Sequence, residues 1–176
     1  MQASWPSENI VLALLCERPM HGYELAQCVK SDEALHAIWR IERSEIYFLL
    51  GKLAKSGYII ERAQEQVNGP SRTIFEPTAA GRSALEAWLR TPDLHPRNLR
   101  TSLLARAYLA LRRDPGLAIE LIDTQKGYLA EWLAQERERT FADPVVALVR
   151  RVRAAQVEAT IDALNELRQL AASRSA

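Results

Sequence analysis

Two Asp-Pro dipeptides, Asp114-Pro115 and Asp143-Pro144, place the strongest constraint on how this chain folds. An aspartate that caps a helix, followed by proline at the first helical position, is a strong helix start signal. The helices predicted after them run to about Phe141 and Ala172, so each has about 27 residues and a length of roughly 40 Å. Their apolar stripes comprise Leu121, Ile122, Gln125, Leu129 and Trp132 in the first, and Val145, Val149, Val152, Val157, Ile161 and Leu164 in the second.

Long helices with an apolar stripe must pack against something of similar length. Two antiparallel helices from one chain leave their shared groove half covered, and a second copy of the chain is the simplest cover because two-fold dimers are the commonest oligomers. We therefore predict that residues 99–176, which begin with a further helix over about 99–112, form a helical dimerisation domain. A self-contained three-helix bundle is the alternative.

Residues 1–90 show a different order of elements. We predict helices over about 8–17 (capped by Ser7), 23–30 and 43–56, strands over about 58–63 and 72–75, and a helix over about 79–89. Asn68-Gly69 between the strands is a strong hairpin signal. Gly57 suits the left-handed position after a helix, and Thr78 suits a helix cap. Residues 91–98, with two prolines and no periodicity, are predicted to be a linker.

This order predicts a mainly α fold with a small β-hairpin wing, namely a winged helix-turn-helix at residues 1–90. In that fold the third helix enters the major groove of DNA and the wing flanks it. Ile46, Leu49, Leu50 and Leu53 form one apolar stripe, so the opposite face of the helix at about 43–56 is predicted to point outward. The candidate DNA-binding residues are Tyr23, Arg43, Ser44, Glu45, Tyr47, Lys52 and Lys55, with Asn68 and Arg72 in a wing at about 64–73.

The side chains in this set have different predicted roles. Arg43, Lys52 and Lys55 can pair with phosphates, whereas Ser44 and Glu45 near the start of the helix can reach base edges. Tyr47 and Phe48 are adjacent and cannot both face the core, so we predict that one of them contacts DNA; the alternative is that Phe48 packs under the first helix. His21 is either a neighbour of a phosphate or a structural turn residue.

Charge and motifs narrow the function further. The net charge is only +1, and residues 1–90 carry 10 basic against 11 acidic residues. The overall charge therefore does not indicate a nucleic-acid-binding protein. It favours the alternative function, a winged-helix adaptor that binds another protein and has no specific DNA binding. We expect no enzyme, cofactor or metal site, because no phosphate-binding glycine loop, GxSxG motif or metal-ligand spacing is present.

Membrane insertion is also not expected. The longest apolar run, 10–16, has seven residues, whereas a membrane-spanning helix needs roughly 20. No secretory signal opens the chain. We therefore predict a cytoplasmic protein with no membrane contact.

Several separate segments resemble PadR-type transcriptional regulators. They are the run 10–15 with Pro19-Met20-His21-Gly22-Tyr23-Glu24-Leu25, then Trp39, Ser44-Glu45-Ile46-Tyr47, Leu50, Leu53 and Gly57-Tyr58-Ile59, and finally Gly69-Pro70-Ser71-Arg72, Phe75, Thr78, Gly81, Leu85, Trp88 and Leu89. The resemblance implies a homodimeric DNA-binding regulator, usually a repressor, that binds double-stranded DNA and is often released by a small molecule. We expect the operator to be an inverted repeat with half-sites about one helical turn apart.

Some features of the resemblance concern particular residues. Aromatic residues at the dimer interface sandwich flat hydrophobic ligands in some family members, so a small hydrophobic or aromatic effector is implied. The family tends to have basic residues where this chain has Thr73 and Glu76, and a small residue or proline where it has Arg43. The wing is therefore less basic than expected, and Arg43 is predicted to supply charge from the helix instead.

Overall fold

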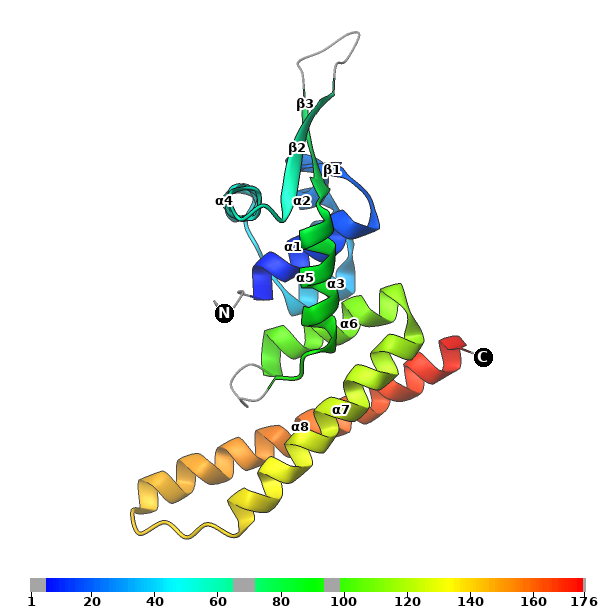
Figure 1. The fold of residues 1–176 in the computed structure, drawn as a ribbon. Coiled ribbons are helices and arrows are strands. Elements are labelled where there is room, and N and C mark those ends of the chain that lie inside the picture. The colour runs from blue at the N-terminus through cyan, green and yellow to red at the C-terminus, as the bar shows by residue number, and fades with distance from the viewer. Residues whose placement is uncertain (1–5, 65–71, 94–98, 176) are drawn as a thin grey trace. The chain divides into compact units, whose positions relative to one another are not determined.

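The computed structural model describes residues 6–64, 72–93 and 99–175 and divides into two compact units, Met1–Leu89 and Arg90–Ala176 (Figure 1). Each unit has its own core of buried side chains. None of the helices within the described ranges is both long and apolar enough to cross a membrane.

The first unit contains five helices and three strands among its described residues (Figure 1). In chain order these are α1 (Pro6–Glu17), β1 (Met20–His21), α2 (Gly22–Ser31), α3 (Glu33–Ile38), α4 (Arg43–Lys55), β2 (Ile59–Gln64), β3 (Arg72–Pro77) and α5 (Ala79–Arg90). The central helix is α1, whose side chains from Ile10 to Leu15 are almost wholly buried. It contacts α2, α4 and β3, so the remaining elements pack around one apolar helix.

The sheet has one strand more than the sequence predicted. Its order is β1-β3-β2, with both pairings antiparallel. Met20 lies opposite Phe75 in the short pairing, and Ile59 lies opposite Pro77 in the hairpin. A two-residue strand carries no detectable alternation of apolar and polar residues, so β1 could not be recognised from sequence. Its pairing ties the start of α2 to the base of the wing.

Helix α3 is a second difference from the prediction. The sequence suggested only a polar connection between α2 and Trp39, but a six-residue helix forms there. The side chain of Asp32 accepts a hydrogen bond from the backbone N–H of Leu35 (2.9 Å), and Leu35 is fully buried. One cap and one buried side chain are enough to stabilise a helix whose length is below what periodicity can detect.

Ser7 does not have the role that the sequence assigned to it. Helix α1 begins at Pro6, so Ser7 lies inside the helix. Its hydroxyl instead accepts a hydrogen bond from the indole N–H of Trp39 (3.1 Å), which is 5% exposed. This bond joins the segment before α4 to α1 and places Trp39 in the core.

The junction of α4, the wing and α5 follows the predicted turn chemistry. Gly57 has a φ of 73°, which confirms the left-handed position at the end of α4. The Thr78 hydroxyl accepts a hydrogen bond from the N–H of Gly81 (3.1 Å), which confirms that Thr78 caps α5. The same hydroxyl donates to the carbonyl of Gly57 (2.8 Å). One side chain thus connects the end of α4 to the start of α5.

All regular elements among the described residues of the second unit are helices. It contains a π-helical turn η2 (Leu99–Leu103), α6 (Leu104–Arg113), α7 (Pro115–Arg137) and α8 (Pro144–Ser175). Asp114 accepts from the N–H of Gly116 (2.8 Å), and Asp143 accepts from those of Val145 (2.7 Å) and Val146 (3.1 Å), so both predicted start signals are confirmed. The predicted ends were less accurate, because α7 stops at Arg137 rather than near Phe141 and α8 continues to Ser175. The π-turn was not predicted.

Helices α7 and α8 lie side by side and share a core (Figure 1). Its buried members are Leu103, Ile122, Leu129, Leu133, Val157 and Leu164, with Trp132, Ala154, Ile161 and Leu167 packed against them. The earlier part of α8 behaves differently. Val145, Leu148, Val149 and Val152 are 68%, 54%, 43% and 51% exposed, although they form a stripe at i, i+3, i+4 and i+7.

The geometry of a helix explains this difference. At about 100° per residue, Val157 lies about 140° around the helix from Val152 because five residues separate them. The apolar stripe of α8 therefore changes face: the later residues point toward α7, and the earlier ones do not. Leu170, which is 57% exposed, falls on the same line as Val152. We call Val145, Leu148, Val149, Val152 and Leu170 the outer stripe of α8.

A buried polar cluster joins the start of the second unit to α6 and α7. The backbone of Asp93 donates to the side-chain oxygen of Gln125 (2.7 Å) and accepts from its side-chain nitrogen (2.9 Å). Arg106, 4% exposed, pairs with the Asp93 carboxylate (3.5 Å) and donates to the carbonyl of Thr91. Burial lowers the pKa of Arg106, and the Asp93 carboxylate opposes that shift.

Gly81 gives a direct test of the junction in the first unit. A Cβ built at this position would lie 2.1 Å from the carbonyl oxygen of Tyr58. Because that atom belongs to the backbone, Gly81→Ala should lower the free energy of unfolding by about 1–3 kcal/mol, as overpacking typically does. Urea unfolding of the full chain measures this change.

Gly51→Ala is the matched control. Gly51 lies within α4, and a Cβ there would meet nothing within 4 Å. Alanine should stabilise the helix by about 0.5–1 kcal/mol. Equal effects of the two substitutions would contradict the close approach at Gly81.

Candidate nucleic-acid interface

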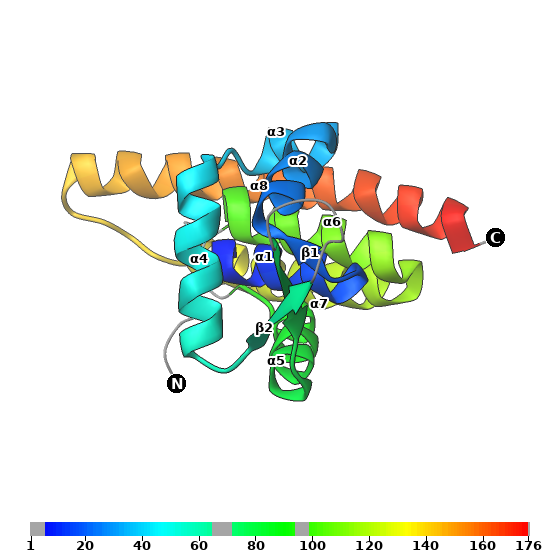
Figure 2. The same cartoon turned by 90° about the horizontal axis from the view of Figure 1, so that it is seen from above.

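The two faces of α4 differ in their exposure to solvent. Ile46, Leu49, Leu50 and Leu53 are at most 7% exposed, because the helix packs against α1, α2 and β2. Figure 2 shows α4 at the side of the first unit, next to α1 and α2. The buried stripe therefore turns the other side of the helix, which carries Arg43, Ser44, Tyr47 and Lys55, outward.

The start of α4 is held by a capping interaction. Glu42 has an extended backbone conformation, and its N–H donates to the carboxylate of Glu45 (3.1 Å). Glu45 is exposed and was predicted to reach base edges. One of its carboxylate oxygens instead has a local partner, so its first role is to stabilise the first turn of α4.

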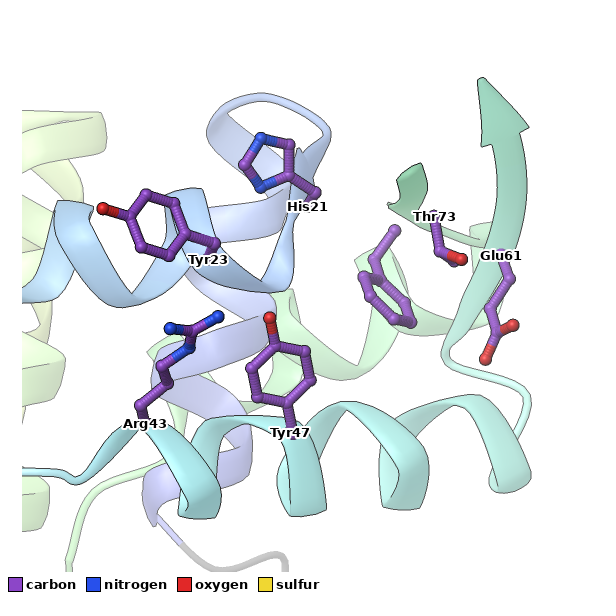
Figure 3. A pocket seen from close by; sticks show the side chains of 7 residues that line it. His21, Tyr23, Arg43, Tyr47, Glu61 and Thr73 are labelled. Atoms are coloured by element: carbon purple, nitrogen blue, oxygen red, sulfur yellow. The ribbon is translucent and has the colours of Figure 1, made fainter. Parts of the chain in front are cut away.

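Arg43 lies between two tyrosine rings in that first turn (Figure 3). The guanidinium carbon is 4.9 Å from the ring centre of Tyr23 on α2 and 5.7 Å from that of Tyr47 on α4. Such cation–π contacts contribute about 0.5–2 kcal/mol each. Both rings remain about half exposed, at 48% and 44%. We call Tyr23 and Tyr47 the tyrosine pair.

The tyrosine pair lines a groove between α2, α4 and the wing. The groove has a volume of about 660 Å³, and Figure 3 shows that side chains from all three elements border it. Its lining comprises His21, Tyr23, Arg43, Tyr47, Glu61, Thr73 and Phe75. The structure thus brings three predicted site residues together: Tyr23, Arg43 and Tyr47.

The position of Tyr47 depends on the glycine at the start of α2. A Cβ on Gly22 would lie 2.6 Å from the ring carbon Cε1 of Tyr47. The ring therefore packs directly over the Gly22 backbone. The absence of a side chain at residue 22 lets Tyr47 approach α2 and stand beside Arg43.

The two lysines of α4 have different environments. Lys52 forms an ion pair with Glu8 of α1, whose side chain is 10% exposed. Lys55 is exposed, and no ion pair of Lys55 is found within the described ranges. The sequence pattern predicts equivalent roles for the two cations, but only Lys55 has its charge uncommitted to another side chain of the described structure.

The remaining predicted residues are only partly described. Ser44 is exposed on the first turn of α4. Arg72 is the first residue of β3, opposite Gln64, whereas Asn68 lies outside the described residues. Tyr47 and Phe48 are both exposed, Phe48 by 71%. The alternative that Phe48 packs under the first helix is therefore wrong.

Some lining residues were missed, and others have structural roles. His21 accepts a hydrogen bond at Nδ1 from the N–H of Glu24 (3.0 Å), so it caps α2. Glu61 was not predicted, although it lies two residues after the buried Ile59 and therefore on the same face of β2. In the parts of the chain that the structure describes, no group of three or more His, Cys, Asp or Glu side chains could hold a metal ion.

A compact helical unit with one outward-facing helix beside a β-hairpin defines the winged helix-turn-helix class. Residues 11–87 match the family model described as the transcriptional regulator PadR-like family. The match spans most of the first unit, and by its description the family consists of transcriptional regulators rather than enzymes.

Three of the solved structures similar to this chain differ in how much of it they match. Bacillus subtilis PadR in complex with operator DNA has 20% identity and a TM-score of 0.48, over 94% of this chain and 98% of that one. The smu.1704 protein of Streptococcus mutans has 30% identity and a TM-score of 0.39, over 46% of this chain and 69% of that one. A PadR family regulator of Clostridium difficile has 20% identity and a TM-score of 0.40, over 46% of this chain and 79% of that one. No curated protein matches the chain.

The Lys52–Glu8 pair predicts unequal effects of removing the two lysine charges. Lys52→Met leaves the buried Glu8 carboxylate without its partner, which should lower the free energy of unfolding by about 1–3 kcal/mol. Lys55→Met removes an exposed charge and should change it by less than about 0.5 kcal/mol. Urea unfolding at neutral pH measures both, and equal values would contradict the assignment.

Proposed function

We propose that the chain is a homodimeric, sequence-specific DNA-binding regulator. Helix α4, at about residues 43–56, enters the major groove, and the wing at about 64–73 flanks it. The observation that carries this proposal is the outward face of α4, where the exposed Arg43, Tyr47 and Lys55 stand opposite a fully buried apolar stripe.

The remaining candidate residues complete the proposed interface. Lys55 contacts a phosphate, and Tyr23 and Tyr47 offer hydroxyls to phosphate oxygens. Ser44 faces base edges from the first turn, and Glu45 contacts a base with the oxygen that the Glu42 N–H leaves available. Lys52 contacts DNA while it keeps its ion pair with Glu8. Asn68 and Arg72 of the wing remain proposed contacts.

The outer stripe of α8 supports the homodimer. Its four residues from Val145 to Val152 form a helical line of apolar side chains that the described part of the second unit does not cover. Burying one such side chain contributes about 1.5–3 kcal/mol. A second copy presents the same stripe across a two-fold axis, so each helix supplies the cover for the other.

The proposed direction of regulation and the proposed effector rest on the similarity of the first unit to the PadR-like family. We propose repression, an inverted-repeat operator whose half-sites lie about one turn apart, and release by a small hydrophobic or aromatic molecule. The proposed location is the cytoplasm. A protein-binding adaptor remains the competing function, and selection of a binding site from random DNA distinguishes it.

DNA binding is tested with charge reversal on α4. Lys55→Glu places a carboxylate against the phosphate backbone, so operator affinity should fall at least tenfold at moderate salt and its dependence on salt should weaken. The operator is first selected from random duplex DNA, and affinities are then measured by fluorescence anisotropy over a range of salt concentrations.

Arg82→Glu on α5 is the matched control. Arg82 is exposed and the charge reversal is of the same sign, but α5 lies outside the proposed interface, so affinity should change less than threefold. If the unmodified protein selects no DNA sequence, the proposal of a sequence-specific regulator is wrong and the protein-binding adaptor is favoured.

Dimerisation is tested on the outer stripe. Val149→Asp places a carboxylate in the proposed interface, where burying an unpaired charge costs several kcal/mol. The variant should sediment as a monomer at concentrations where the unmodified protein is a dimer. Thr124→Asp, at an exposed polar position of α7, is the control and should remain dimeric; a dimeric Val149→Asp protein would place the interface elsewhere.

A further inference from the structure

The surroundings of Arg43 leave a particular part of its side chain available. A guanidinium group is planar, with two faces that stack on aromatic rings and an edge of N–H donors. The Tyr23 and Tyr47 rings lie within 6 Å of its carbon atom. A cation–π contact uses none of the N–H donors of the guanidinium in a conventional hydrogen bond, so donors of Arg43 stay available to a ligand.

No acidic side chain in the described structure uses that edge. Arg43 forms no ion pair with any described residue. The carboxylate of Glu45, two residues further along α4, accepts from the backbone of Glu42. Glu61 borders the same groove from β2, without an ion pair to Arg43. An exposed arginine thus has two aromatic contacts and no acidic partner among the described residues.

We propose that Arg43 donates two parallel hydrogen bonds to N7 and O6 of one guanine in each operator half-site, and that the tyrosine pair positions it to do so. This inference rests on the proposed function and assigns the base that the recognition helix identifies. It makes Arg43 a specificity-determining residue rather than an additional phosphate contact, which is the role that the sequence suggested.

The placement of Arg43 favours a base over a phosphate. The N-terminal residues of a recognition helix are those that contact base edges in the major groove, and Arg43 is the first residue of α4. A bidentate contact of arginine to guanine is the commonest specific contact in such complexes. Such a contact requires a fixed orientation of the guanidinium, which contacts with two rings favour, whereas a phosphate accepts donors from many directions.

The tyrosine pair is itself fixed by packing. The ring of Tyr47 lies over the Gly22 backbone, and Tyr23 follows Gly22 directly at the start of α2. Both rings therefore lie beside the same turn at the start of α2, and the Gly22 backbone limits where the ring of Tyr47 can lie. Tyr23 and Tyr47 act here as positioning residues, because they orient the guanidinium rather than identify the base.

The experiment uses the full-length protein and the operator selected from random duplexes. Each guanine of a half-site is replaced in turn by 7-deazaguanine, which lacks the N7 acceptor but pairs normally. We expect one position per half-site at which this replacement weakens binding of the unmodified protein about tenfold or more, within the range for removing a bidentate interaction. Arg43→Ala removes both hydrogen bonds, so it should lose at least as much affinity on normal DNA and show no further loss when that guanine is replaced.

Arg43→Lys and Lys55→Ala separate charge from geometry. Lysine keeps the positive charge but not the planar fork, so Arg43→Lys should select sites with relaxed preference at that one position. Lys55→Ala should weaken binding to all sequences uniformly and reduce the salt slope by about one, as expected when one phosphate is no longer neutralised. Thermal unfolding establishes that the three variants are folded.

The proposed positioning role of Tyr23 is tested through the base preference of two Tyr23 variants. Tyr23→Phe keeps the ring face and should retain the guanine preference, whereas Tyr23→Leu removes the ring and should relax the preference at the same position as Arg43→Lys. Equal preferences for the two Tyr23 variants would remove Tyr23 from the positioning role.

Two results would overturn the inference. In the first, Arg43→Ala selects the same bases as the unmodified protein and binds with a smaller salt slope, which identifies a phosphate contact. In the second, no guanine position responds to the 7-deaza replacement. Neither result affects the proposed function, which fails only if the unmodified protein selects no sequence; in that case the guanine contact is also rejected.

Discussion

The burial of one apolar stripe of α4 against α1 and α2 is the constraint on which the first unit depends. Ile46 and Leu50 are 1% exposed, and a helix with such a stripe has no freedom to rotate about its axis without exposing it. The identity of the outward face follows directly. Because α2 lies against α4 through the same core, the tyrosine of each helix reaches the same side, and the groove beside the wing results from how these two helices pack.

Local backbone chemistry was the part of the fold that could be predicted from sequence. The turn at Gly57 and the helix caps formed by Thr78, Asp114 and Asp143 each involve atoms only a few residues apart, so these local features do not depend on the rest of the fold. The bond from Thr78 to the Gly57 carbonyl, which joins residues 21 positions apart, is not of this kind. The hairpin and the long helices follow for the same reason. Helix α3, strand β1 and the π-turn are too short for periodicity, and each is stabilised by interactions that only the folded chain provides.

The candidate site was predictable as a face but not as a set of interactions. The spacing of the buried residues assigned Arg43, Tyr47, Lys52 and Lys55 to one side of a helix. Nothing in the spacing distinguishes Lys52 from Lys55, because Glu8, which binds Lys52, lies 44 positions earlier in the chain. The contact between Arg43 and Tyr23 is equally non-local, since it joins two helices whose relative position is set by packing.

The change of face along α8 has a consequence for how readily association could arise or disappear. Val152 and Val157 are separated by five residues, so the two halves of the helix present their apolar side chains in different directions. Shortening that interval by a single residue would bring the side chains from Val145 to Val152 to the side of α8 that faces α7, whereas Leu170 would stay on the outer side. The spacing between two valines therefore decides whether the first turns of α8 present their apolar side chains to the neighbouring helix of the same chain or to the surroundings.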